Sequence, residues 1–593
     1  MPGIVGDTAN KDISEMIAQM KYVNMYSRKK LTEILTSSGN IGLGLICSQD
    51  SSECYAIKEN SKTGFIDGFV FIDDESSCKD KNELNKKIIT GILQSPENIL
   101  PLLNGSFLIA CTDGKKLIVA TDKLATRPCF YTFQKGRLRI GSQIKSILPL
   151  LERSSINIEG IGDLLAFEFL LGERTLVKEI SSIPPSSFIE WENGKIKKKK
   201  YWTFNFEYTK SQKEYPKKLL KVYEESVDNV LKTIDSSQKV GIFLSGGLDS
   251  RLLFGVLLKK NIDFLAITYD TNPPGGVNPD ISKNISARFG IKNIIADFPY
   301  DIADFPDLIK ESVWITDGLT PWHFFYIINF DLNQLHKHVD VIINNPRQGE
   351  FFGEDLTINE LTSPLEPVEI LRNNFRTFRN PVPETIVEGL LKGKYSVRKE
   401  IQREILKSNK SSSHETLLDV MYNNYYPNFY RVNISTNLVE LKNIFSSVKL
   451  LDEITNLPLN LRMKRLPVIK KIPMYPVSPL KLELIRLVDM GLEKIQYERT
   501  GAQAQEGMYK HFIKFAKKSF FKNKNIYDFS KLIREEKLKK YIYTDIDFLC
   551  RKELIDSDIA YDILDRHMSG KVDFSRMLGS LTTAGLYIEK AFG

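Results

Sequence analysis

The chain has 593 residues, of which 42% are hydrophobic, and this is long enough for two or more domains that each have a core. Its 82 basic and 74 acidic residues leave a formal net charge of +8, an excess too small for a surface dedicated to nucleic acid. The six cysteines form no C-x-x-C pair, which argues against a disulfide framework and a cysteine-ligated zinc site.

The first third of the chain is predicted to be rich in β-strands. It opens MPGIVGDTANKD, without a charged leader, and no run of about 18 uncharged apolar residues follows, so we expect a cytoplasmic protein without membrane contact. From Ile4 to about Trp202, short apolar runs such as IGLGLI and SFLIAC alternate with turn signals. Helical patterns near Ile13–Met25 and Lys86–Leu93 favour a sheet layered with a few helices. The Lys-rich stretch 195–200 is interpreted as a solvent-exposed face.

A different pattern begins near Lys213, where predicted helices and strands alternate as in a doubly wound parallel sheet. The predicted elements are helix Tyr215–Ile234, strand Val240–Leu244, helix Arg251–Lys259, strand Phe264–Tyr269, helix Asp280–Phe289 and strand 339–345. From about Leu356 onward, long helical segments with Pro-containing breaks dominate. The expected fold class is therefore a two-domain α/β protein whose parallel sheet carries a helical extension.

The turn between the first strand and helix of this pattern, in VGIFLSGGLDSRLL at 240–253, carries the strongest functional signal. Ligands bind at the carboxyl ends of the strands in such sheets. Glycines there let backbone amides approach an anion at the start of the helix, and the hydroxyls can donate to phosphate oxygens. Asp249 would repel a bare anion but suits a phosphate-bound Mg²⁺. The residues predicted to form this phosphate-binding turn are Leu244, Ser245, Gly246, Gly247, Asp249 and Ser250.

The turn also has a purely structural interpretation. A Gly-Gly turn also occurs where a strand and a helix simply pack, with Ser and Asp as helix caps. The chain has no G-x-x-x-x-G-K-[ST] motif, so the turn is not the phosphate loop of kinases and GTPases.

The motif S-G-G-x-D-S after an apolar strand resembles the pyrophosphate loop of the asparagine-synthetase-like ATP pyrophosphatases. The first part is similar to the class II glutamine amidotransferase domain of the same family, through the opening Pro2-Gly3-Ile4-Val5-Gly6 and the segments NGSF, ATDKLATRPCFY and GSQIKSIL at 104–107, 120–131 and 141–148. The resemblance implies an amidotransferase-like domain of Ntn type at 1–205 and a synthetase domain at 213–593. It also implies ATP and Mg²⁺ as cofactors and is compatible with a homodimer.

The amidotransferase-like part departs from the family at its reactive positions. Active members use the thiol of an N-terminal Cys as the nucleophile, whereas Pro2 has no nucleophilic side-chain atom. The R-G-P-D segment is absent, and Asp67-Gly68-Phe69 replaces N-G-E. We therefore expect no hydrolysis of glutamine.

The second acidic motif of the family, S-G-x-G-x-D-E-x-F-G-G, is also altered. The corresponding segment is INNPRQGEFFGED at 343–355, in which Glu350 is the candidate second ligand of Mg²⁺, or else a solvent-exposed loop acid. Arg347 would neutralise phosphate charge, or else form a surface ion pair.

Three further residues are assigned by the resemblance. Ile267, in the strand FLAITYD, is expected to line the adenine pocket, or else to be a core residue. Lys494 and Arg499, in EKIQYERTG, are expected near the active site, where they would bind phosphates or a developing negative charge. Asp249, Glu350, Lys494 and Arg499 form the predicted catalytic set.

The resemblance implies an AMP-forming ligase in which a carboxylate on a small molecule or peptide is adenylated and an amine then displaces AMP. The amine would be ammonia, an amine on a second molecule, or one within the same substrate, as in the β-lactam synthetases and lasso-peptide cyclases. A catalytically weakened homologue that acts as a nucleotide-binding, regulatory or scaffold subunit is the leading alternative. A tRNA-modifying pyrophosphatase would not explain the first third.

Overall fold

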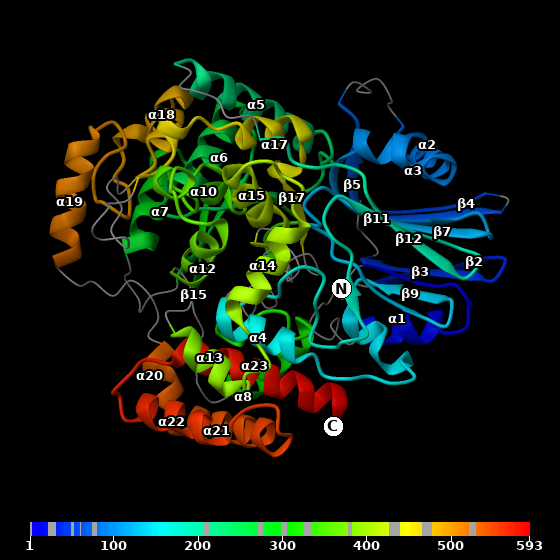
Figure 1. Cartoon of the computed structure of the whole chain (residues 1–593). Coiled ribbons are helices and arrows are strands. Elements are labelled where there is room, and N and C mark those ends of the chain that lie inside the picture. Colours follow the sequence, from blue (N-terminus) through cyan, green and yellow to red (C-terminus); the bar gives the residue numbers. More distant parts are fainter. Residues whose placement is uncertain are drawn as a thin grey trace.

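The computed structural model describes two parts of the chain that lie side by side (Figure 1). It describes residues 3–21, 31–48, 53–59, 61–73, 80–206, 213–270, 277–297, 305–324, 335–377, 382–425, 439–464, 477–520 and 529–593. Pro2 and most of the predicted Pro-containing break after residue 464 lie outside these residues.

The first part is rich in β-strands, as the apolar runs predict, and its strands form two six-stranded antiparallel sheets rather than one sheet. One sheet has the order β10-β8-β9-β1-β3-β2, with β1 (Gly3–Asp7), β2 (Leu31–Ser38), β3 (Ile41–Ser48), β8 (Phe130–Gln134), β9 (Arg137–Gly141) and β10 (Ser181–Ser182). The other has the order β12-β11-β7-β6-β5-β4, with β4 (Cys54–Glu59), β5 (Lys62–Phe71), β6 (Asn104–Thr112), β7 (Lys116–Thr121), β11 (Ser187–Glu192) and β12 (Lys195–Lys200).

The two sheets pack face to face and are covered by helices on their outer faces (Figure 1). Apolar side chains from both sheets, such as Leu43 and Leu108, form the core between them. Helices α2 (Lys81–Gln94) and α3 (Pro96–Ile99) cover one outer face, and α1 (Ile13–Lys21) covers the other. The result is a four-layer α/β/β/α arrangement, and its assignment as an Ntn-type fold stays a prediction.

The second part contains a five-stranded parallel sheet, as predicted, in the order β15-β14-β13-β16-β17. Its strands are β13 (Val240–Phe243), β14 (Leu265–Asp270), β15 (Asn293–Asp297), β16 (Val341–Asn344) and β17 (Glu440–Asn443). From β13, the first of these strands in the sequence, the sheet extends to one side through β14 and β15 and to the other side through β16 and β17. The crevice between β13 and β16 is therefore the topological switch point of the sheet.

Helices connect and cover this sheet, and the remainder of the chain is mostly helical. They are α4 (Ile158–Phe167), α5 (Tyr215–Leu231), α6 (Leu248–Lys259), α7 (Val277–Arg288), α8 (Phe305–Ile315), α10 (Gln348–Phe351), α11 (Ile358–Leu361), α12 (Pro367–Thr377), α13 (Glu384–Leu390), α14 (Val397–Lys407), α15 (Ser413–Val420), α17 (Val448–Thr455), α18 (Pro479–Val488), α19 (Met508–Phe520), α20 (Phe529–Arg534), α21 (Glu536–Arg551), α22 (Ser557–Met568) and α23 (Ser575–Phe592).

Three predicted helices begin earlier in the structure than in the prediction: α2, α6 and α7, of which α7 begins at Val277 instead of Asp280. Helix α2 begins at Lys81 because Asp80 caps it, accepting hydrogen bonds from the backbone N–H groups of Asn82 and Glu83. Helix α6 begins at Leu248, three residues before the predicted start at Arg251. Asp249 and Ser250 therefore belong to the first turn of α6.

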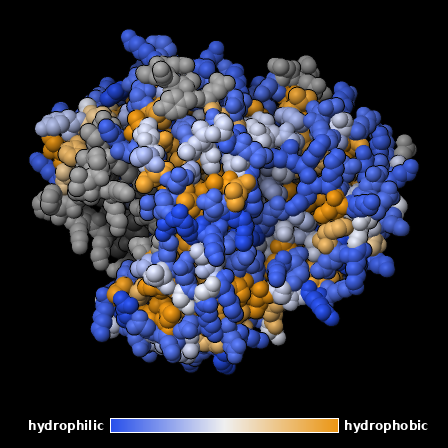
Figure 2. All heavy atoms as spheres, viewed as in Figure 1, coloured by the Kyte–Doolittle hydropathy of each residue, from blue (hydrophilic) through white to orange (hydrophobic). Residues whose placement is uncertain are grey.

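The two parts are in direct contact. Helix α4, which belongs to the first part in the sequence prediction, packs against α12, α13, α14 and α23. Strand β17 of the parallel sheet also contacts β6 of the first part. Among the described helices, none combines the length and the apolar character needed to cross a bilayer. The surface in Figure 2 is largely hydrophilic, with hydrophobic side chains in separate small groups.

Candidate active site at the carboxyl ends of the parallel strands

Two loops meet at the switch point of the parallel sheet. The first follows β13 and contains residues 244–247, and the second follows β16 and leads into the short helix α10. Asn345 in the second loop donates from Nδ2 to the backbone oxygen of Asp249, with a distance of 2.9 Å. Gln348 Nε2 also donates to this oxygen, at 3.2 Å. The sheet therefore brings together the two segments that the sequence singled out.

The three backbone N–H groups at the start of the first loop are engaged within the protein. The N–H of Ser245 donates to Ser250 Oγ at 3.0 Å, and that of Gly247 donates to Ser245 Oγ at 3.1 Å. The N–H of Gly246 donates to Oδ1 of Asn278 in α7. All three acceptors are polar side chains, which a phosphate oxygen can replace at these amides.

The next three N–H groups, those of Leu248, Asp249 and Ser250, form the open N-terminus of α6. Gly247 is the N-cap residue and supplies no side-chain acceptor, and the described residues place no other acceptor at these amides. Helix α6 has 12 residues, so its dipole adds to the attraction of these N–H groups for an anion. This helix start is suited to bind a phosphate group.

Asp249 lies in a cluster of charged side chains that the sequence analysis did not predict. Lys481 of α18 lies 2.7 Å from the Asp249 carboxylate and 2.9 Å from that of Glu354. The pKa of Asp249 is raised above its usual value. Partial burial and the neighbouring Glu354 and Glu350 raise it, and the opposing effect of Lys481 is smaller. Burial alone would lower the pKa of Lys481, but Asp249 and Glu354 raise it above its usual value. A protein cation is thus held beside the predicted metal ligand.

Because Gly349 has no side chain, the cluster of Asp249, Glu354 and Lys481 has room beside the second loop. A Cβ at residue 349 would lie 2.9 Å from Glu354 Oε2 and 3.0 Å from Lys481 Nζ, closer than side chains pack. The glycine therefore permits the close approach of Lys481 to the second loop.

Glu350, the other predicted metal ligand, forms an ion pair with Arg347 in which Nη1 and Oε1 are 2.6 Å apart. Although burial opposes its charge, the Arg347 guanidinium lowers the pKa of Glu350. The side chains of Arg347 and Glu350 are 10% and 20% exposed, so this pair is mostly buried rather than the surface pair weighed from the sequence. The role of Glu350 as a metal ligand stays a prediction.

Oxygen ligands are the donors that Mg²⁺ prefers, and it is usually bound by one or two carboxylates together with substrate phosphates. Asp249 fits this role, because its side chain is 38% exposed and lies beside the open amides of α6. The described residues contain no group of three or more His, Cys, Asp or Glu side chains arranged to hold a metal ion.

Arg251 links the first loop to the segment 492–498, and sequence reasoning missed it. Its side chain is fully buried and donates to the carbonyl oxygens of Gly246, Ile495 and Gln496 at 3.1, 2.9 and 2.8 Å. Burial lowers the pKa of Arg251 to about 10, against the opposing effects of Tyr497 and Glu498. The available signal was an arginine inside the apolar helical run LDSRLLF.

The structure brings part of the segment EKIQYERTG to the loop. The N–H of Glu498 donates to the carbonyl oxygen of Gly246 at 3.1 Å. Lys494 is exposed at the end of a single 3₁₀ turn, Leu492–Lys494. The exposed Arg499 lies over the ring of Phe515 in α19, 6.0 Å from its centroid. The catalytic roles of Lys494 and Arg499 stay predictions.

Ile267 is a core residue by its side chain, which is 1% exposed. Its carbonyl oxygen accepts a hydrogen bond from the N–H of Leu244 at 2.8 Å, which fixes the end of β13 against β14. Neither observation tests the predicted contact with adenine.

In the first part, the segment Asp67-Gly68-Phe69 lies within β5, beside a network of buried charges. Arg127 forms ion pairs with Asp67 and Glu53, and Lys442 of β17 lies 2.9 Å from Glu53. Although burial opposes its charge, Lys442 and Arg127 lower the pKa of Glu53. The network joins the two parts of the chain.

Two sequence-family models match separate segments of the chain. The model described as a glutamine amidotransferase domain matches residues 87–202. The model described as asparagine synthase matches residues 221–343, which include β13, the first loop and α6.

The chain is also similar to curated proteins. Asparagine synthetase (glutamine-hydrolyzing) 1 of Bacillus subtilis (strain 168) is 24% identical over 287 residues, which are 48% of this chain and 44% of that protein. A putative asparagine synthetase (glutamine-hydrolyzing) of Mycobacterium tuberculosis (strain ATCC 25618 / H37Rv) is 22% identical over 316 residues, 51% of this chain and 47% of that protein. The match thus spans less than half the length of these relatives.

Among solved structures, an NH3-dependent NAD synthetase from Campylobacter jejuni is similar to 36% of this chain and 95% of its own, with 18% sequence identity and a TM-score of 0.17.

Proposed function

Because this chain is an asparagine synthetase family protein, we propose that it is an ATP-dependent carbon–nitrogen ligase. In this proposal it adenylates a carboxylate substrate and transfers an amine to it without hydrolysing glutamine. The observation that carries the proposal is the start of α6, where the N–H groups of residues 248–250 have no acceptor among the described residues. An open helix start beside an acid is the arrangement that a metal-bound pyrophosphate requires.

The proposed reaction has two steps. A carboxylate oxygen of the substrate attacks the α-phosphorus of ATP, and the bond from this phosphorus to the bridging oxygen breaks, so pyrophosphate leaves with the electron pair. The amine then attacks the acyl carbon and loses a proton, and AMP leaves. The products are an amide, AMP and pyrophosphate.

The residues of the chain would act by positioning and charge stabilisation. The amides of 248–250 would bind the departing pyrophosphate, and Lys481 would hold the Asp249 carboxylate in place at 2.7 Å. Asp249 would hold a Mg²⁺, which neutralises pyrophosphate charge when bound. Arg251 would keep the first loop against residues 495–496.

The absence of glutamine hydrolysis is proposed from the residues of the first part. Pro2 lies outside the described residues, so its proposed effect rests on its chemistry. Asp67 is 3% exposed and ion-paired with Arg127, which supports a structural role for this segment rather than glutamine binding. We expect ammonia release from glutamine to stay at background in a coupled glutamate dehydrogenase assay.

A second function is favoured by other observations at the same loops. The amides of 245–247 are occupied by side chains of the protein, and Glu350 is neutralised by Arg347. These features suit a regulatory or scaffold subunit that binds a nucleotide but does not catalyse a reaction.

Exchange of labelled pyrophosphate into ATP tests the ligase proposal. The assay uses the full chain with Mg²⁺ and pools of amino acids and other carboxylates, since adenylation is reversible in the presence of the correct acid. We expect exchange by the wild type, and a decrease of about 100-fold or more in Asp249→Ala. Asp280→Ala, which removes an exposed acid of the neighbouring α7, is the matched control and should exchange normally.

The remaining outcomes separate the two functions. ATP binding by calorimetry without exchange for any acid would favour the regulatory subunit. Neither binding nor exchange would contradict both proposals.

A further inference from the structure

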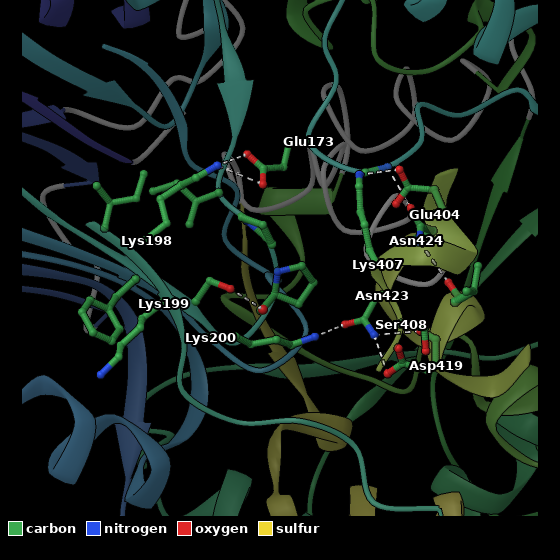
Figure 3. A pocket seen from close by; sticks show the side chains of 18 residues that line it. Glu173, Lys198, Lys199, Lys200, Glu404, Lys407, Ser408, Asp419, Asn423 and Asn424 are labelled. Carbon is green, nitrogen blue, oxygen red and sulfur yellow. Dashed lines mark hydrogen bonds and ion pairs between the residues drawn. The ribbon is translucent and has the colours of Figure 1, made fainter. Parts of the chain in front are cut away.

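A cavity of about 270 Å³ lies between the two parts of the chain, and neither loop of the candidate active site contributes to it. One wall is formed by residues 172–173, 183–189 and β12 of the first part. The other is formed by α14, α15 and the turn that follows α15. Figure 3 shows the charged and amide side chains that surround this cavity.

Two pairs of charges in the lining neutralise each other directly. Lys198 Nζ lies 2.9 Å from the carboxylate of Glu173, and Lys407 Nζ lies 2.5 Å from that of Glu404. Lys199 points away from the other labelled side chains and forms an ion pair with Glu97 at 2.8 Å (Figure 3). Together with Glu97, which lies outside the lining, these side chains form three neutral pairs. One further pair of charges in the lining is not in direct contact.

That further pair is Lys200 and Asp419, which are joined only through an amide. Lys200 Nζ donates to Asn423 Oδ1 at 2.6 Å, and Asn423 Nδ2 donates to Asp419 Oδ1 at 2.9 Å. Asp419 is 9% exposed, and within the described part of the chain no cation lies at ion-pair distance from it. An ammonium group has three donors and a carboxylate has two oxygens, so both ends keep free hydrogen-bonding capacity.

The walls of the cavity are fixed in position. Asn423 and Asn424 lie on a single π-helical turn, Met421–Tyr425, a rare conformation that is frequent at functional sites. Asn424 Oδ1 accepts a hydrogen bond from the N–H of Gly172 at 2.7 Å, which ties the two walls together. Ser408 Oγ is buried in the lining and has no hydrogen-bond partner among the described residues. This hydroxyl can donate to or accept from a molecule in the cavity.

We propose that this cavity binds a free α-amino acid, whose carboxylate pairs with Lys200 and whose ammonium group pairs with Asp419. A simple anion would lie against the buried acids Glu404 and Asp419, and a simple cation would lie against the lysines. A zwitterion with its two charges on one carbon satisfies both ends of the separated pair. The volume is below the range of about 300–1,000 Å³ that drug-sized ligands occupy, which suits a small molecule.

Calorimetric titration of the full chain with the common amino acids, one at a time and without ATP, tests this proposal. We expect at least one to bind saturably with a stoichiometry of one. Lys200→Met and Asp419→Asn should each weaken binding by about tenfold or more, because each removes one charge-assisted contact. Lys199→Met, on the same strand but turned away, is the matched control and should bind as the wild type does.

Two analogues and one further variant make the test specific. The N-acetyl derivative and the decarboxylated amine of the same amino acid each lack one charge and should bind more weakly. Asp249→Ala should keep the binding, which separates this cavity from a substrate site at the first loop. Because Lys200 is exposed at the cavity rim, its variant remains informative if Asp419→Asn fails to fold.

Three results would overturn the proposal. They are the absence of binding by every amino acid, binding that neither Lys200→Met nor Asp419→Asn weakens, and equally tight binding of acetate or inorganic phosphate. Each of these is independent of pyrophosphate exchange, so the cavity proposal and the ligase proposal fail separately.

Discussion

At the scale of single residues, Lys481 is the least expected member of the candidate site. It contacts Asp249 and Glu354, yet it lies 232 positions after Asp249 in the sequence. No local pattern joins an α18 lysine to a loop after β13, because the contact exists only once the sheet and α18 have packed. Asp249 itself was predictable, since its position at the end of a strand follows from the local pattern of apolar and turn residues.

The Lys481 contacts lead to a prediction about Mg²⁺. Lys481→Met should lower the free energy of unfolding by about 1–3 kcal/mol, because it leaves Asp249 and Glu354 close together without a cation. Added Mg²⁺ should restore part of this loss in the variant and change the thermal midpoint of the wild type little. Lys217→Met, which removes an exposed lysine of α5, is the control. Equal responses of both variants to Mg²⁺ would contradict the assignment.

A second residue-scale prediction concerns pH. Asp545 of α21 is 6% exposed, and burial together with Glu589 raises its pKa to about 8, against the effect of Lys310. The folded chain therefore keeps a proton that the unfolded chain releases between about pH 4 and this value, so stability falls as the pH rises through this window.

Asp545→Asn removes the carboxyl group that titrates. The thermal midpoint of the variant should therefore exceed that of the wild type by more near pH 8 than near about pH 5. Thermal unfolding at both pH values measures it, with the exposed Asp558→Asn of α22 as control. A gain that is equal at both pH values, or larger at the lower one, would show that Asp545 is ionised in the folded chain.

At the scale of elements, the strand-turn-helix unit around residues 240–259 was predicted correctly, but the start of its helix was not. The apolar run at helical spacing from Leu252 predicts a helix start at Arg251, but Leu248, four residues before Leu252, belongs to the same buried face of α6. The acceptor for the N–H of Gly246 was also not predictable. Asn278 belongs to α7, two elements later, and reaches the loop only through packing against β14.

Asn278 leads to an element-scale prediction. It occupies an amide that a phosphate would use, so Asn278→Ala should tighten binding of pyrophosphate by about three- to tenfold, the equivalent of one ordinary hydrogen bond. Asn284→Ala, an exposed asparagine of the same helix, should leave binding unchanged. Titration calorimetry with pyrophosphate measures both. Weaker binding in Asn278→Ala would mean that the asparagine itself contacts the ligand.

At the scale of the whole molecule, the sequence predicted two parts and their classes of fold but not how they join. Strand pairing within each part follows from apolar patterns, whereas the junction depends on isolated residues such as Lys442, Glu53 and Arg127. The cavity has the same origin, because its walls come from β12 and α15, more than two hundred residues apart. Residues 195–200 were interpreted as a solvent-exposed face, and Lys200 also lies on the cavity wall.

The junction leads to a prediction for the whole chain. Lys442 is 1% exposed, so Lys442→Met leaves the buried Glu53 with one cation fewer and should cost about 3–5 kcal/mol. Chemical denaturation measures this loss. Lys449→Met, which breaks an exposed pair with Glu225, should cost below about 1 kcal/mol. Similar losses in both variants would show that the network does not hold the two parts together.

The central claim is that the backbone N–H groups at the start of α6 bind the pyrophosphate of ATP, and one substitution tests a single such group. Leu248 is the first residue of α6 and follows an extended Gly247 (φ −75°, ψ 173°), so proline can replace it without disturbing the helix. Leu248→Pro removes both the side chain and the N–H, whereas Leu248→Ala removes most of the side chain only. Calorimetry should find pyrophosphate binding weakened by about tenfold in Leu248→Pro relative to Leu248→Ala. Equal affinities of the two folded variants would contradict the claim.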